Sequence, residues 1–263
     1  MIRSDVGYAF RALVADLHTV APAIQPHPKA GIVVPMANEE TTITAFVRRV
    51  LKQLGPDDVM YCIFDGACRD STMDKVKALA EDDARIQVIF DENSKGPVDA
   101  YFRGYREALD GGCEWIVEMD AGLAHLPEHI PRFFEALANG AEFAPGSRFM
   151  PGAHYYGGRF LHKHLLSRGG TFLANVLLRT RYSDLTGGFK GHTRRVLQRV
   201  VDRGVHSKAH SFQIEVRQML DDEYWEEVPI TYRGASHVID KSIVADCLLQ
   251  LGKLWRKAGK ERK

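Results

Sequence analysis

Long apolar runs, cysteine pairs and an excess of charge of either sign are all missing from this 263-residue sequence. The longest apolar runs fall well short of the ~20 residues that a membrane-spanning helix needs, so we expect a protein that is not integral to a membrane. The N-terminus has no charged-then-apolar signal pattern. Lysine and arginine number 35 against 34 for aspartate and glutamate, which gives no reason to expect nucleic acid as a partner.

Cysteine is sparse and scattered, with no CxxC pair and no spacing typical of a zinc site. The four residues are Cys62, Cys68, Cys113 and Cys247. Two of them lie inside or beside apolar runs, which predicts reduced thiols and a cytoplasmic protein. Apolar residues make up 45% of the chain, enough for the core of one domain of this size.

Short apolar runs alternate with helix-length segments over the first half of the chain. The runs span residues 31–35, 59–64, 86–90, 115–119 and 141–144. This alternation predicts an α/β fold, with a mostly parallel central sheet flanked by helices on both faces. The expected helix starts are an Asn38 cap for residues 39–54, an Asp70 cap for residues 71–80, and Pro127 in the first turn of a helix that ends near Asn139.

Three segments are expected in the domain organisation. Residues 1–29 are predicted to form an amphipathic helix around residues 8–17 followed by a proline-rich linker. Residues 30–240 are predicted to form a single domain. Residues 241–263 read as a basic amphipathic helix and tail, because the last eleven residues, KLWRKAGKERK, contain six cations and one acid. Such a tail suits contact with anionic lipid, and a solubilising frayed terminus fits the same pattern equally well.

Polar, small and acidic residues follow each of the first four predicted strands, where ligands bind in parallel α/β sheets. The segments are VVPMANEE, FDGACRDST, DENSKGPVDAYFRGYREAL and MDAGLAH. A GxGxxG loop is absent after the first strand, which argues against a dehydrogenase. The carboxylates of Glu39, Asp65 and Asp120 suit ribose hydroxyls, base N–H groups and a metal better than they suit bare phosphate.

Six motifs follow one another in a fixed order: VVPMANEE, DGACRDST, KGPVDAYFRGYREAL, GSRFMPGA, DLTGGFKGHTRRVL and SFQIEVRQML…WEEVPITYR. Together they resemble the inverting GT-A glycosyltransferases of family 2, and most closely the dolichol- or polyprenyl-phosphate mannose synthase branch. The resemblance covers roughly residues 30 to 245. It implies a GT-A, Rossmann-like fold and transfer of a hexose from a nucleotide sugar to a lipid phosphate.

The same resemblance implies roles for individual residues. It implies that the donor nucleotide is contacted by Pro35, Asn38, Glu39, Asp65, Lys95 and Asp120. Contacts to donor and acceptor phosphates fall to Arg148, Arg159, Arg233 and Lys241. Asp120 takes the first position of the DxD motif, whose carboxylates hold Mg²⁺ or Mn²⁺ on the sugar diphosphate. The residues expected to act in catalysis are Asp120, Arg148 and Asp184.

The DxD motif is incomplete, because Gly122 stands in place of its second aspartate. One interpretation keeps a weakened metal site on Asp120 alone, helped by Glu118 or by His125. A second has the leaving diphosphate stabilised mainly by protein cations, with Arg148, Arg233 and Lys241 available for this. A third makes the protein a nucleotide binder without turnover. A turn glycine with a positive φ angle at position 122 is compatible with all three.

The segment between Arg148 and Asp184 carries six basic residues and no acid before Asp184, with apolar side chains interleaved. A basic, apolar helix of this kind suits a membrane interface, and an ordinary core helix with solvated cations fits the pattern as well. The family resemblance favours membrane contact. His162 and His164 are two residues apart and point away from each other on a helix, so a histidine metal site is the minority interpretation.

The identity of the acceptor decides whether a catalytic base is needed. A lipid phosphate is already an anion at neutral pH and attacks without losing a proton, so basic residues that position it suffice. A sugar hydroxyl would need a base, for which Asp184 is the candidate; a capping role for Asp184 within the TGGF turn is the alternative.

The sequence therefore predicts an inverting glycosyltransferase that transfers a hexose to a polyprenyl or dolichyl phosphate. The family favours mannose from GDP-mannose, with UDP-glucose next. The alternatives are an enzyme with a soluble hydroxyl acceptor and a catalytically silent nucleotide-sugar binder. The expected partners are the nucleotide sugar, the lipid phosphate and the cytoplasmic face of a membrane, and the oligomeric state is left open.

Overall fold

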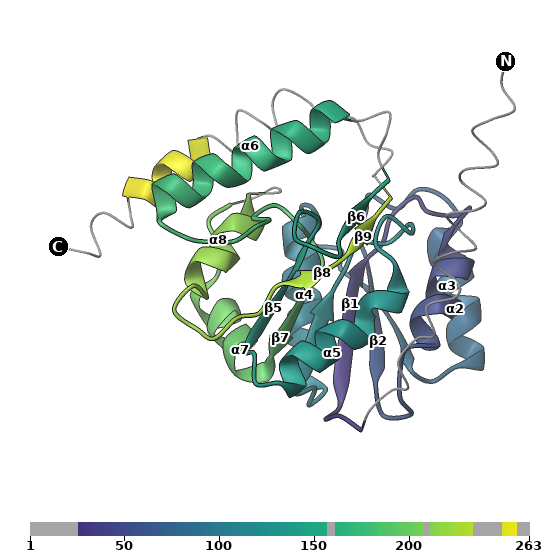
Figure 1. The fold of residues 1–263 in the computed structure, drawn as a ribbon. Coiled ribbons are helices and arrows are strands. Elements are labelled where there is room, and N and C mark those ends of the chain that lie inside the picture. The colour runs from purple at the N-terminus through teal and green to yellow at the C-terminus, as the bar shows by residue number, and fades with distance from the viewer. Residues whose placement is uncertain (1–25, 157–160, 208–210, 234–248, 257–263) are drawn as a thin grey trace, which may run out of the picture.

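A seven-stranded sheet with the order β3-β2-β1-β4-β7-β5-β8 forms the centre of the fold (Figure 1). Its strands are β1 (Ala30–Pro35), β2 (Val59–Phe64), β3 (Ile86–Phe90), β4 (Trp115–Glu118), β5 (Phe143–Ser147), β7 (Lys190–Thr193) and β8 (Val228–Pro229). Only β7 runs antiparallel to its neighbours, β4 and β5. A separate parallel pair joins β6 (His154–Tyr155) to β9 (Thr231–Tyr232). This computed structural model describes residues 26–156, 161–207, 211–233 and 249–256.

Helices cover both faces of the sheet. They are α2 (Ile43–Leu51), α3 (Thr72–Asp82), α4 (Pro97–Asp110), a 3₁₀ turn η1 (Pro127–His129), α5 (Ile130–Ala138), α6 (Leu161–Leu178), α7 (Arg194–Arg203) and α8 (Phe212–Met219). One buried cluster packs α2, α3 and α5 against the sheet, and a second packs α4, α7 and α8 against the opposite face. The predicted α/β class with a mostly parallel, helix-covered sheet is confirmed.

Helix α4 lies unusually close to the centre of the sheet. A Cβ atom at Gly104 would come within 2.3 Å of the Val33 side chain, so only glycine lets the helix approach β1 this closely. The close approach buries Tyr101 and Tyr105 on the same helix. It therefore brings the tyrosine side chains of α4 to the end of β4.

Helix α6 crosses above the edge of the sheet where β1, β4 and β5 end, and residues 249–256 form a short helix beside one end of it (Figure 1). Ala174 and Leu178 of α6 share a buried cluster with Leu251 and Leu254 of the short helix. The opposite side of α6 carries exposed apolar side chains. The predicted N-terminal helix, with most of the predicted linker and tail, lies outside the described residues.

The helix starts differ in detail from the sequence predictions. Asn38 does not cap α2, which begins at Ile43 after Thr42. Asn38 instead has a positive φ of 58° and bonds the loop that follows β2, so tertiary contacts take precedence over its local capping tendency. The Asp70 carboxylate accepts the Thr72 amide at the start of α3, as a cap would. Strand β5 runs on through Pro145 to Ser147, three residues beyond the predicted end.

Candidate functional site

The donor side of the site lies where β1, β2 and β4 end together. Parallel pairing places Pro35 of β1 opposite Ile63 of β2, and Val33 opposite Glu118 of β4. The residues directly after these strands therefore meet at one edge of the sheet. Asp65 follows β2 and Asp120 follows β4.

The loop after β1 is fixed by hydrogen bonds to the start of α3. The Asn38 side chain accepts the Arg69 amide at 2.9 Å and donates to the Ala67 carbonyl at 2.9 Å. The Glu39 amide donates to Thr72 Oγ1 at 2.8 Å. The Glu39 carboxylate accepts the Thr42 hydroxyl at 2.9 Å. These bonds hold Asn38 and Glu39 in place before any ligand arrives.

Asp65 is nearly buried at the end of β2, with 9% of its surface exposed. One carboxylate oxygen accepts the Ala67 amide at 2.9 Å and the other accepts the Ser94 hydroxyl at 2.9 Å. The bond to Ser94 brings the loop after β3 to the same edge. Lys95 follows it with an exposed side chain, and its amide donates to Asp99.

Asp120 is held from two sides and remains open on a third. The Tyr101 hydroxyl donates to its Oδ1 atom at 2.6 Å, and the Asp120 amide donates to His125 Nδ1 at 3.3 Å. The Asp120 side chain is still 52% exposed. Burial lowers the pKa of His125, which keeps its ring neutral. Because His125 Nδ1 accepts the Asp120 amide, that nitrogen orients the loop, and assistance from His125 to a metal at Asp120 stays a prediction.

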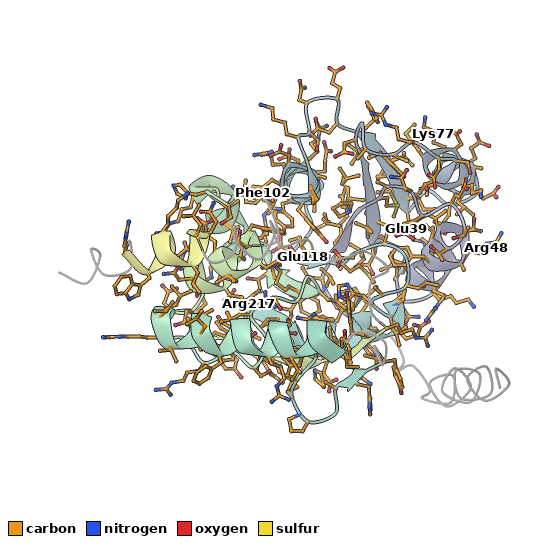
Figure 2. All side chains as sticks on the ribbon, turned by 90° about the horizontal axis from the view of Figure 1, so that it is seen from above. Glu39, Arg48, Lys77, Phe102, Glu118 and Arg217 are labelled. Carbon is orange, nitrogen blue, oxygen red and sulfur yellow. The ribbon has the colours of Figure 1, made fainter. Side chains whose placement is uncertain are left out.

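Glu118 belongs to a buried polar network and not to the exposed edge. Its Oε1 atom lies 2.6 Å from Lys190 Nζ with both side chains fully buried, and Tyr105 donates to its Oε2 atom. Burial raises the pKa of Glu118, but Lys190 and His192 outweigh burial and leave the pKa below its ordinary value. Figure 2 shows Glu118 and Arg217 well inside the outline of the molecule. The expected help from Glu118 in metal binding is therefore wrong, because its carboxylate is fully buried and paired with Lys190.

Gly122 adopts a positive φ of 85°, which confirms it as a turn glycine. A Cβ atom there would lie 2.5 Å from each oxygen of the Glu39 carboxylate. The side chain of Glu39 therefore fills the space into which a side chain at position 122 would extend. Sequence separation hid this contact, because the two positions are 83 residues apart along the chain.

Arg148 forms a second polar cluster, beneath α6. Its guanidinium donates to both oxygens of Asp184, at 2.6 and 2.8 Å, in a bidentate pair. The Nη2 atom of Arg148, which bonds Asp184 Oδ1, also donates to Ser167 Oγ at 3.0 Å and to Thr186 Oγ1 at 2.6 Å. Its Cζ atom lies 5.3 Å from the centre of the Tyr232 ring. Ser167, Thr186 and Tyr232 were not predicted from the sequence as site residues. The nearest sequence signals were the GSR loop, which contains Arg148, and the TGGF turn, which contains Thr186.

The Arg148–Asp184 pair makes the folded state sensitive to acid. Asp184 is fully buried; burial raises its pKa, but Arg148 more than offsets this and lowers the pKa to about 2. A depressed carboxyl pKa stabilises the fold above the unfolded pKa, and this stabilisation is lost as the pH falls through the folded value.

We therefore expect the difference in unfolding free energy between wild type and Asp184→Asn to shrink by ~2 kcal/mol as the pH falls from about 5 to about 2. Urea unfolding across that range measures it. A difference that stays constant over the range would show that the pair does not titrate as described.

Of the three remaining candidates for phosphate binding, the structure describes one, Arg233. The Arg233 amide donates to the Ala124 carbonyl, which ties the chain after β9 to the Asp120 loop. Arg159 and Lys241 lie outside the described residues. The structure therefore brings Arg148 and Arg233 to the same edge of the sheet as the donor residues.

The carboxylates at the edge fit a divalent metal only in part. Within the described residues, no group of three or more His, Cys, Asp or Glu side chains is arranged to hold a metal ion. Mg²⁺ and Mn²⁺ prefer oxygen ligands and commonly take one or two from a protein, with phosphates and water completing the shell. Asp120 and the Glu39 carboxylate beside Gly122 match that donor set, provided that a diphosphate supplies further oxygens.

A mostly parallel sheet with carboxylates beyond β1, β2 and β4, crossed by a helix at the same edge, defines an α/β protein of the GT-A type. Residues 31–201 match the family model described as glycosyl transferase family 2. The chain belongs to this family and is a glycosyltransferase, which confirms the resemblance seen in the sequence.

The similar proteins agree with this assignment. An undecaprenyl-phosphate mannosyltransferase from Micrococcus luteus is 28% identical over 76% of this chain and 82% of its own length. A polyprenol monophosphomannose synthase from Mycolicibacterium smegmatis is 30% identical over 80% of this chain and 79% of its own length. Glucosyl-3-phosphoglycerate synthase from Mycobacterium tuberculosis, crystallised with Mg²⁺ and UDP, superposes with a TM-score of 0.63 at 16% identity, covering 88% of this chain and 82% of that chain. At that identity the structural likeness establishes the fold alone.

Proposed function

We propose that this glycosyltransferase transfers a hexose, with inversion, from a nucleotide diphosphate sugar to a polyprenyl or dolichyl phosphate. One observation carries the proposal: Asp120 of the donor edge and Asp184 of the Arg148 cluster flank the same turn, since a Cβ atom at Gly188 would lie 3.3 Å from Asp120 and one at Gly187 would lie 3.4 Å from Asp184. Helix α6 lies above this edge (Figure 1). The names of the two mannosyltransferase relatives support the acceptor class and favour mannose from GDP-mannose, with UDP-glucose as the second choice.

In the proposed reaction an oxygen of the acceptor phosphate attacks the anomeric carbon from the face opposite the leaving group. A new C–O bond forms as the bond to the diphosphate oxygen breaks, and the nucleoside diphosphate leaves with that electron pair. The acceptor phosphate is already an anion, so no base is required. Inversion follows from this single displacement.

On the donor side, Pro35, Asn38, Asp65 and Lys95 would hold the nucleotide. Asp65 would contact the base or ribose with carboxylate oxygens that Ala67 and Ser94 already orient. A bound Mg²⁺ or Mn²⁺ would stabilise the negative charge that develops on the leaving diphosphate. Asp120 would hold that ion, with its carboxylate oriented by Tyr101.

On the acceptor side, Arg148 and Arg233 would bind the lipid phosphate, with Ser167 as a hydroxyl donor. Asp184 fits a positioning role better than that of a base. Its carboxylate is fully buried, bonded to Arg148 through both oxygens, and has a pKa of about 2, which makes it a weak proton acceptor. A hydroxyl acceptor is correspondingly disfavoured.

Membrane contact would come from the exposed side of α6 and from the helix at residues 249–256. The exposed apolar side chains there are Leu165, Phe172, Leu173, Val176, Leu249 and Trp255. The exposed cations beside them are Arg168, Arg179, Lys253 and Arg256. No helix among the described residues is both long and apolar enough to cross a bilayer. An apolar strip flanked by cations suits peripheral contact with an anionic, cytoplasmic membrane face.

The double substitution Phe172→Ser and Val176→Ser should weaken binding to anionic vesicles by about tenfold, because it removes two large exposed apolar side chains from α6. Vesicle co-sedimentation measures the affinity. Tyr224→Ser is the control, since Tyr224 is 59% exposed and its carbonyl bonds Glu142 at the opposite end of β5. Equal loss of binding in both variants would contradict a docking role for α6.

Thermal unfolding with a panel of nucleoside diphosphates and their sugars, with and without Mn²⁺, tests the proposed donor. A ligand present at 100 times its dissociation constant should add ~2.7 kcal/mol of stability. We expect GDP or UDP compounds to stabilise the protein more with Mn²⁺ than without it. Absence of stabilisation by every nucleotide would contradict the donor site. Binding without transfer to lipid phosphate would favour a silent nucleotide-sugar binder.

A further inference from the structure

The space beside Gly122 is occupied by a carboxylate from another loop. A Cβ atom at position 122 would lie 2.5 Å from both Glu39 oxygens and 2.6 Å from its carboxyl carbon. A side chain at position 122 would therefore start inside the volume that Glu39 fills. The loop after β1 thus presents an acidic group at the place where residue 122 has no side chain.

Glu39 is positioned by groups that do not belong to a ligand. The Thr42 hydroxyl donates to its Oε2 atom at 2.9 Å, and the Glu39 amide donates to Thr72 Oγ1 at 2.8 Å. The Glu39 carbonyl accepts the Ile43 amide at 2.8 Å in the first turn of α2. The bond from Thr42 uses one oxygen of the carboxylate, so the same group retains lone pairs for a cation.

Asp120 reaches the same edge from β4. Tyr101 bonds its Oδ1 atom, and the Oδ2 atom lies 3.3 Å from the place of a Cβ at Gly188, where glycine leaves the carboxylate uncrowded. Asp120 precedes Gly122 by two residues in the loop after β4, and Glu39 reaches Gly122 from the loop after β1. Two carboxylates together with diphosphate oxygens and water would satisfy the coordination that Mg²⁺ or Mn²⁺ requires.

We infer that Glu39 supplies the second carboxylate of the metal site, in place of the acid that position 122 lacks. The inference rests on the proposed nucleotide-sugar donor, because the diphosphate provides the remaining oxygens. It also changes the role expected for Glu39, from a contact to the nucleotide itself to a contact to the ion that the nucleotide carries. These two roles differ in their dependence on metal.

Titration calorimetry with GDP or UDP, in Mn²⁺ and in EDTA, separates the two roles. We expect the Glu39→Gln variant to reduce the metal-induced gain in affinity by about tenfold or more, since even outer-shell partners of a metal are worth that much. Its affinity in EDTA should equal that of the wild type. Glu40→Gln is the matched control, because the neighbouring carboxylate is exposed and bonds Ser71 on the α3 side.

Moving the carboxylate from position 39 to position 122 tests whether an acid at either position supports metal binding. The double variant Glu39→Ala and Gly122→Asp clears the space at position 122 and fills it with an acid, and aspartate tolerates a positive φ better than most residues. We expect it to recover part of the metal-induced gain and to restore the electron paramagnetic resonance signal of protein-bound Mn²⁺–nucleotide that Glu39→Gln weakens.

Two results would overturn the inference: a Glu39→Gln variant with the full metal-induced gain, or one that loses affinity equally in Mn²⁺ and in EDTA. The second result would assign Glu39 to the nucleotide. A wild type that binds neither nucleotide in either buffer would overturn the proposed function, and the inference would fall with it.

Discussion

Replacement of Lys190 by methionine is expected to lower the free energy of unfolding by about 3–5 kcal/mol, because it leaves the Glu118 carboxylate buried without its cation. The two charges lie 2.6 Å apart, and neither side chain has any exposed surface. Burial lowers the pKa of Lys190 to about 8 even though Glu118 opposes the shift, which indicates how strongly this interior disfavours an unpaired charge. Urea unfolding at neutral pH measures the loss.

Two further variants separate the unpaired charge from the loss of a side chain. Lys77→Met changes an exposed lysine of α3 at the edge of the molecule and should alter stability little (Figure 2). The double change Glu118→Leu and Lys190→Met removes both charges and should recover much of the stability lost in the single variant. A single variant as stable as the wild type would contradict the description of a buried ion pair.

Replacement of Asp120 by asparagine is expected to reduce sugar transfer by about 10²–10³-fold, because it removes the charge proposed to hold the metal on the leaving diphosphate. Asparagine can still accept the Tyr101 hydrogen bond, so the thermal unfolding temperature should change little. Initial rates at saturating donor, with Mn²⁺ varied, measure the effect.

Asp110→Asn is the matched control for this variant, because Asp110 is exposed at the end of α4 and lies away from the strand ends that form the site. It should transfer sugar at the wild-type rate. An Asp120→Asn enzyme that retains metal-dependent transfer at the wild-type rate would show that the ion is held elsewhere. Undiminished transfer that does not depend on metal would show that protein cations take its place.

The strand pattern of the first half was predictable, because its buried parallel strands are short apolar runs with turn residues between them. The same rule missed β7, whose residues KGHT include a lysine and a histidine that are both buried. Lys190 is stabilised by Glu118 and Gln213, which come from other elements, and His192 Nε2 lies 3.7 Å from the same Glu118 carboxylate. A strand buried through polar pairing leaves no periodic apolar signal in its own sequence.

The positions of Asp65 and Asp120 in the candidate site were predictable, because each follows a buried strand whose end the sequence marks. The site was not predictable where two loops share one space, as at Glu39 and Gly122. Asp184 illustrates a second limit, since the TGGF motif marks its importance but not its partner. The structure supplies that partner: the bidentate contact with Arg148, together with the full burial of Asp184, favours a positioning role over that of a base.

The central claim is that the edge holding Asp65 and Asp120 binds an activated sugar beside a lipid-phosphate site at Arg148. The most direct test incubates the protein with a radiolabelled nucleotide sugar, Mn²⁺ and vesicles that contain polyprenyl phosphate, and then identifies the product in the lipid phase. The account predicts a polyprenyl phosphate hexose of inverted anomeric configuration. Transfer only to a soluble hydroxyl acceptor, with no labelled lipid, would contradict it.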